Sequence, residues 1–158
     1  MTARPLLLAL CAGLGLGAAA SAVDAAGVVP AEFHGVWVPA KASCDSPLRV
    51  VVASDRLTLR NGHDSEPFTG IEMAGSGYFP PNYNGIMAVL ITESNGDQPV
   101  TATFNLREKR GVAQVEFAPV LPGKGNAQQA KYNAHMSKLD LARRFPLHQA
   151  ALKRCATT

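Results

Sequence analysis

The sequence predicts an all-β or mainly β fold, an antiparallel meander that closes into a small barrel or sandwich of about seven to nine strands. Three observations predict it. Short apolar segments alternate with polar residues at the two-residue period of a β-strand. Glycine, asparagine, aspartate and proline separate these segments, as turns require. Helical periodicity is confined to the C-terminal region, where a short helix is one of two interpretations.

Residues 1–22 have the features of a cleavable export signal. Arg4 precedes an apolar run, and Ala20-Ser21-Ala22 fits the small-x-small rule for cleavage. The run is too short for a good membrane span, which needs about 20 mainly apolar residues. Cys11 lies within the run but follows Leu10, whereas lipidation normally requires a small residue before the cysteine.

We therefore expect an exported protein, periplasmic or secreted, with no membrane insertion after signal removal. A mobile N-terminal lead over 23–31 and a single β-domain over 32–158 should follow the signal. Cys44 and Cys155 remain in this product, and an even number of cysteines in an exported chain implies a disulfide bond. Closing so long a loop stabilises the fold by about 4 to 5 kcal/mol through loop entropy.

The central part of the chain predicts successive hairpins. Residues 48–53 and 56–62 form the first, with Leu57 and Leu59 on one face. Residues 85–93 are apolar at nearly every position, which predicts a central strand covered on both faces. Asn95-Gly96 then predicts a type I′ turn.

Two alternating strands are expected next, over 99–108 and 112–120. The chain after Pro122 permits two interpretations. Residues 130–144 form either an amphipathic helix that uses Tyr132, Met136 and Leu139, or a strand that ends in KLDL. Residues 145–155 form either a helical turn begun by Pro146 or a last strand through Leu152.

Gly35-x-Trp37 on the first strand, the run of hairpins and Arg154 before Cys155 resemble the calycin plan of lipocalin-like barrels. The chain also resembles small exported bacterial proteins with the same G-x-W and terminal cysteine. The resemblance implies a lipocalin-like barrel in which Trp37 closes the floor and Arg154 packs across its indole. It also implies that Gly35 leaves room for close backbone approach. A core position is the plainer interpretation of Trp37.

Charge is unevenly distributed. Residues 23–121 carry seven basic and eleven acidic side chains, and residues 122–158 carry seven basic and one acidic. The basic residues of the second region are spread out, which favours packing against the acidic body over binding of nucleic acid.

The segment 75–85 is the candidate recognition loop. Tyr78, Phe79 and Tyr83 lie there between glycines and the rigid Pro80-Pro81. Exposed aromatic side chains give a large contact area at low entropic cost. The alternative is that these rings plug the core.

Catalytic, cofactor and metal motifs are not found. His63, Asp64 and Glu66 occupy one turn, but no second ligand cluster accompanies them, so no metal is expected. No nucleophile elbow, zinc-protease motif or phosphate-binding loop occurs either.

The sequence therefore favours a non-enzymatic, inhibitor-like β-domain that binds an unknown protein through a loop or barrel end. A carrier of a small apolar ligand, held in a barrel cavity, is the first alternative. An unrecognised hydrolase is the second.

If Tyr78, Phe79 and Tyr83 form a recognition surface, replacing all three with Ser will leave the melting temperature within a few degrees, because exposed side chains contribute little to stability. The same replacement will abolish co-purification of the partner. Circular dichroism and affinity capture measure the two effects, and unfolding of the triple variant would place the rings in the core.

Overall fold

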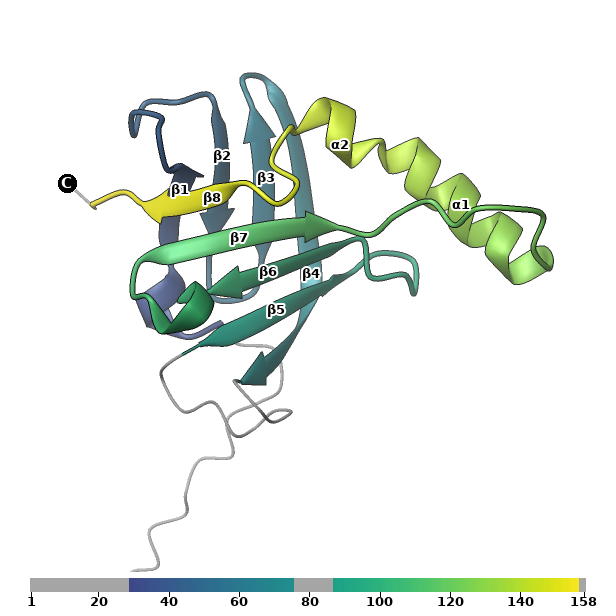
Figure 1. The fold of residues 1–158 in the computed structure, drawn as a ribbon, viewed down its shortest axis with the longest axis horizontal. Coiled ribbons are helices and arrows are strands. Elements are labelled where there is room, and N and C mark those ends of the chain that lie inside the picture. The colour runs from purple at the N-terminus through teal and green to yellow at the C-terminus, as the bar shows by residue number, and fades with distance from the viewer. Residues whose placement is uncertain (1–28, 76–86, 157–158) are drawn as a thin grey trace, which may run out of the picture.

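A computed structural model describes residues 29–75 and 87–156. Over these residues eight antiparallel strands follow one another around a closed barrel (Figure 1). The 3-10 helix η1 (Ala31–Phe33) precedes them, and η2 (Leu106–Glu108) lies between two of them. The strands are β1 (Gly35–Pro39), β2 (Leu48–Val52), β3 (Leu57–Asn61), β4 (Asp64–Gly75), β5 (Ala88–Glu93), β6 (Val100–Phe104), β7 (Val112–Phe117) and β8 (Ala151–Arg154). The predicted mainly β meander is confirmed, and it closes as a barrel.

The chain's own apolar side chains point into the barrel and form its core. Strand alternation directs every second residue inward, and these residues are almost fully buried. The largest of them, each at most 2% exposed, are Trp37, Phe68, Phe104, Leu57, Leu59, Leu90 and Leu152. Burial on this scale, at roughly 25 cal/mol per Å² of apolar surface, is the main stabilising contribution to the fold.

The predicted hairpins are present. Strands β2 and β3 pair from Leu48–Asn61 to Val52–Leu57. Asn95 and Gly96 both have positive φ, 52° and 80°, as the expected type I′ turn requires. Strand β5 is covered less than predicted. Its inward-facing side chains are buried, whereas the outward-facing Val89 and Ile91 are only half-buried and Glu93 is exposed.

The longest strand, β4, is absent from the sequence prediction. Pro67 and Gly70 interrupt its alternation, and its pairing with β5 shifts register between Thr69 and Glu72. Gly70 has a φ of 65° at this irregularity, a conformation that glycine adopts at little cost. A strand with an internal bulge lacks a continuous two-residue period, so the pattern concealed it.

The structure decides between the C-terminal alternatives. Residues 127–139 and 141–144 are helical, as α1 (Ala127–Leu139) and α2 (Leu141–Arg144), with Asp140 in the left-handed conformation between them, and the strand ending in KLDL is wrong. The Asn126 side chain caps α1 by accepting a hydrogen bond from the backbone N–H of Gln129 at 2.9 Å. Of residues 145–155, the last four before Cys155 form strand β8, so the alternative of a last strand holds.

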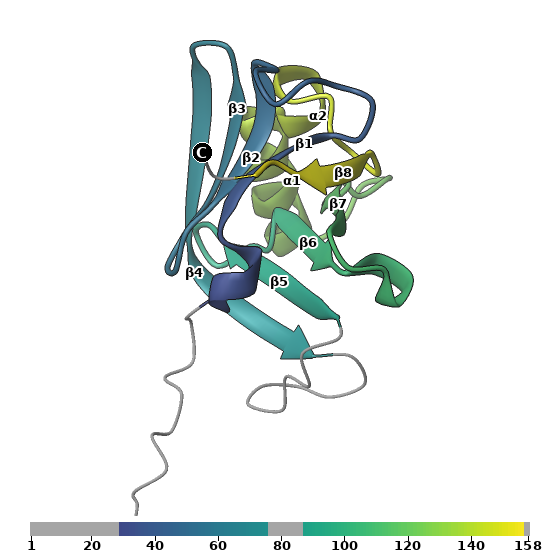
Figure 2. The ribbon, with the colours of Figure 1, turned by 90° about the vertical axis from the view of Figure 1, so that its left-hand side faces the viewer.

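Helix α1 extends away from one end of the barrel (Figure 1), and in the view turned by 90° it lies behind the strands (Figure 2). Only Met136 among its side chains is buried. Polar side chains hold it instead. The Asn133 amide exchanges two hydrogen bonds with the backbone of Leu121, at 2.8 and 2.9 Å, and the Tyr132 hydroxyl donates to the carbonyl of Pro119. The helix is therefore attached mainly through the extended segment that follows β7.

The packed domain includes Val29, three residues before the expected start at Glu32. Val29 is 1% exposed, and its N–H donates to the carbonyl of Ser54 at 2.7 Å. The expected lead over 23–31 is therefore ordered at its end, while 1–28 lie outside the described residues. No helix within the described ranges combines the length and hydrophobicity needed to cross a bilayer.

Trp37→Ala should lower the free energy of unfolding by about 3 to 5 kcal/mol, the usual cost of removing a large buried aromatic side chain. Trp37→Phe is the matched control and should cost less, because most of the buried ring area is retained. Urea unfolding measures both. A native fluorescence maximum like that of free tryptophan in water would contradict the burial on which the prediction depends.

Candidate functional site

Trp37 and Arg154, the two residues that the resemblance paired, lie on neighbouring strands at one end of the barrel. Their Cα atoms are partners in the β1–β8 ladder. The Trp37 indole N–H donates to the carbonyl of Phe33 at 2.9 Å, and its ring packs edge-on against Phe104 with centroids 4.9 Å apart. The indole is thus buried with its polar atom satisfied, which is the arrangement of a packing residue.

Gly35 and Arg154 lie close together. A Cβ at Gly35 would lie 3.6 Å from Nε of Arg154, and the backbone φ of 122° strongly favours glycine. Nη1 of Arg154 also donates to the carbonyl of Glu32 at 2.9 Å. Arg154 therefore links the last strand to η1. Its stacking on the Trp37 indole stays a prediction.

The predicted disulfide bond is present between Cys44 and Cys155, whose Cα atoms are 5.7 Å apart. It connects the segment between β1 and β2 to the residue that follows β8. The N–H of Cys155 also donates to the carbonyl of Val36 at 2.8 Å, so hydrogen bonding and the covalent link hold the same point.

Asp64 and Glu66 bind the guanidinium group of Arg144. Nη2 and Nε of Arg144 donate to the two oxygens of Asp64 at 2.6 and 2.9 Å, and Nη1 donates to Glu66 at 2.7 Å. Asp64 and Glu66 share one face of β4 because strand side chains alternate. Asn61 adds a hydrogen bond from its side chain to the carbonyl of Arg144 at 2.8 Å. We call this set the Arg144 clamp, and it fixes α2 to the β3–β4 hairpin.

Asp64 and Glu66, the carboxylates considered above as metal ligands, bind Arg144 in the clamp. No group of three or more His, Cys, Asp or Glu side chains is arranged to hold a metal in the described part of the chain. The hydrogen bonds from Arg144 hold the pKa of Asp64 below its ordinary value. In return, Asp64 and Glu66 raise the pKa of the Arg144 guanidinium, which is charged at any physiological pH.

Two histidines, His34 and His148, bond to backbone groups. Nδ1 of His148 accepts from the N–H of Phe117 at 3.0 Å, and Nε2 of His34 lies 2.8 Å from the carbonyl of Val29. These contacts attach both imidazoles to backbone groups of neighbouring segments.

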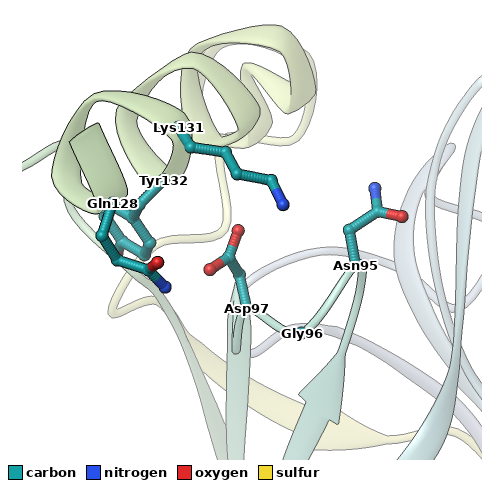
Figure 3. A pocket seen from close by; sticks show the side chains of 6 residues that line it. All are labelled: Asn95, Gly96, Asp97, Gln128, Lys131 and Tyr132. Carbon is teal, nitrogen blue, oxygen red and sulfur yellow. The ribbon is translucent and has the colours of Figure 1, made fainter.

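A small polar pocket lies between the β5–β6 turn and α1, with a volume of about 130 Å³ (Figure 3). Asp97 from the turn and Lys131 from the helix point toward one another across it. The other lining residues are Asn95, Gly96, Gln128 and Tyr132. Ligand pockets usually measure about 300 to 1,000 Å³. This one is better described as a seam between helix and hairpin.

The connection between β6 and β7 has a backbone that the sequence did not predict. Asn105, Arg107 and Glu108 all have positive φ, between 53° and 60°. Asparagine tolerates this conformation, whereas in a non-glycine residue such as Arg107 or Glu108 it costs about 1 to 2 kcal/mol. The Asn105 side chain is buried and accepts a hydrogen bond from the N–H of Gly111 at 3.2 Å. A buried polar side chain thus fixes the base of an exposed connection.

The candidate recognition loop predicted from the sequence, with Tyr78, Phe79 and Tyr83, lies outside the described residues. Its neighbours in the chain are placed. Gly75 pairs with Ala88, and Ala88 pairs with Phe104. Strand β4 therefore ends, and β5 begins, beside the start of the β6–β7 connection.

Comparison with known proteins finds no family model, no curated protein and no solved structure that matches the chain.

Asp64→Asn should destabilise the protein at pH 7, and the difference from the wild type should shrink as the pH falls. The folded pKa of Asp64 is depressed, so its stabilisation is complete above the ordinary value of 3.8 and is lost as the pH falls through the folded value. Urea midpoints across this range measure the effect.

Asp55→Asn is the matched control for this series. The Asp55–Arg56 pair is 3.6 Å apart, with side chains 66% and 52% exposed, and such exposed pairs contribute little. Its unfolding midpoint should follow the wild type at every pH. A difference between Asp64→Asn and the wild type that stays constant from pH 7 to acid would refute the role given to the Asp64 carboxylate.

Proposed function

We propose that this chain is an exported, non-enzymatic β-domain that binds a protein partner through one end of its barrel. We call this end the recognition end. It contains η1, residues 105–111, and the ends of β4 and β5 at Gly75 and Ala88. In both ribbon views η1 and the β6–β7 connection lie at the same end of the barrel (Figures 1 and 2).

The observation that carries the proposal is the strained backbone of the β6–β7 connection. Arg107 and Glu108 are exposed, yet both adopt the left-handed conformation. Two antiparallel strands can be joined by a much simpler turn, so barrel closure alone does not require this geometry. Strained non-glycine residues are concentrated at functional sites, where a fixed shape is worth its cost in stability.

The connection is also held in one shape by hydrogen bonds. The N–H of Lys109 donates to the carbonyl of Leu106 at 3.2 Å, and the N–H of Val112 donates to the carbonyl of Lys109 at 3.3 Å. With the bond from Gly111 to Asn105, these contacts order the connection before any partner arrives. A surface ordered in advance loses less entropy on binding.

The aromatic packing inside the barrel favours a protein partner over a small apolar ligand. Phe33, Trp37 and Phe104 pack together, with the two phenylalanine rings 4.8 Å apart, where a lipocalin-like carrier would need open space. The placement of Gly35 beside Arg154 supports a calycin-like barrel floor, used here for packing. Binding is then expected at the ends of the barrel.

Glu108→Gly should stabilise the protein by about 0.5 to 1 kcal/mol, because the relief of left-handed strain exceeds the entropic cost of glycine. The same substitution should weaken capture of the partner, since the connection loses its fixed shape. Urea unfolding gives the stability. Photo-crosslinking from position 107 in the exported fraction gives the capture.

Gln149→Gly is the matched control. Gln149 is also an exposed residue with positive φ, 56°, but it lies between α2 and β8, away from the recognition end. It should show a similar gain in stability and unchanged capture. Unchanged capture by Glu108→Gly, or cross-linking only from a probe at Lys131 on α1, would remove the recognition end from the proposal.

A further inference from the structure

We infer that the recognition end binds an acidic protein surface; this inference rests on the proposed function and assigns the chemistry of the partner. The residues that carry it are the exposed cations Arg107, Lys109, Arg110 and Arg154, which we call the basic corner.

Strand pairing brings the basic corner together from two parts of the chain. Val112 pairs with Lys153 in the β7–β8 ladder. Continuing this register places Gly111 beside Arg154, so the β6–β7 connection and the end of β8 are neighbours. Arg154 is fixed there by its hydrogen bond to the carbonyl of Glu32 at 2.9 Å. Four cations separated by up to 47 positions in sequence thus share one corner of the barrel.

The charge of the connection is not neutralised within the described part of the protein. Arg107, Lys109 and Arg110 form no ion pair with any described carboxylate, whereas Arg144 is paired with two. Their backbone is held by the hydrogen bonds that order the connection. Unpaired cations on a fixed backbone attract a complementary anionic surface and repel a cationic one.

Two observations favour an acidic protein over a nucleic acid. Glu108 lies between Arg107 and Lys109 and is exposed, so it would repel a phosphate backbone. The basic corner is also compact, whereas a duplex is usually gripped through about six to ten phosphate contacts along a stripe of cations. A protein surface can present carboxylates to the arginines and one cation to Glu108, which would fix the orientation of the partner.

The test uses a fluorescent oligo-glutamate peptide as the probe and the purified full-length chain, at low and at physiological ionic strength. The wild type should bind the peptide, and added salt should weaken binding. The variant R107Q/K109Q/R110Q should bind about tenfold more weakly, because exposed ion pairs each contribute modestly and three are lost. All three side chains are exposed, so circular dichroism and the melting temperature should match the wild type.

The control variant K124Q/K131Q/K138Q removes the same charge from exposed positions at and near α1. It should bind the peptide as the wild type does. Equal weakening by both variants would show attraction by net charge alone and overturn the inference. Failure of the wild type to bind the peptide would overturn it too, as would tighter binding of a DNA oligonucleotide that depends on the same three residues.

The photo-crosslinking experiment separates this inference from the function on which it rests. A photo-crosslinker at position 107 replaces Arg107, so the remaining cations are tested by adding K109Q/R110Q. Capture of a protein from position 107 that is unaffected by salt and by K109Q/R110Q would keep the recognition end and reject its acidic partner. Loss of capture on adding K109Q/R110Q, with capture retained on adding K124Q/K131Q, supports both.

Discussion

The return of the last strand to the first is the constraint on which the rest of this structure depends. Strand β8 has four residues, and three of them pair with β1 while three pair with β7. Without it, β1 and β7 would be open edges with unpaired backbone groups. Closure also brings Leu152, which is 1% exposed, into the hydrophobic core. The disulfide from Cys44 to Cys155 holds the same seam.

The chain between β7 and β8 determines where β8 begins. It leaves the barrel, forms α1 and α2, and returns through Phe145 and Leu147, both fully buried. The Arg144 clamp and the hydrogen bond from Phe117 to His148 fix this return to two different strands. An ion-pair network and a hydrogen bond to the backbone therefore fix this long connection in place, as tight turns fix shorter ones.

The sequence was sufficient for those parts of the fold that follow from local pattern. Alternation around Leu57 and Leu59, and the Asn95-Gly96 turn, specify hairpins because each depends on adjacent residues. The bulge at Gly70 concealed β4, since a break in the period resembles a loop. The Arg144 clamp joins residues about 80 positions apart, which no local pattern reveals. Of the candidate site, the resemblance singled out Gly35, Trp37 and Arg154 but did not predict that Gly35 lies beside Arg154. The left-handed backbone at Arg107 could not, because arginine carries no preference for it.

Because β8 and Cys155 come late in the sequence, they determine the order in which the barrel can form during synthesis. Cys44 and Cys155 are 111 positions apart, and Cys155 follows the last strand. A growing chain emerges from its N-terminus, so β1 to β7 are all available before either β8 or the second cysteine exists. Until β8 is available, β1 and β7 are unpaired edges of an open sheet, and the barrel cannot close. A chain that stops before β8 and Cys155 is therefore left both unclosed and uncrosslinked, with exposed sheet edges and a free thiol at Cys44.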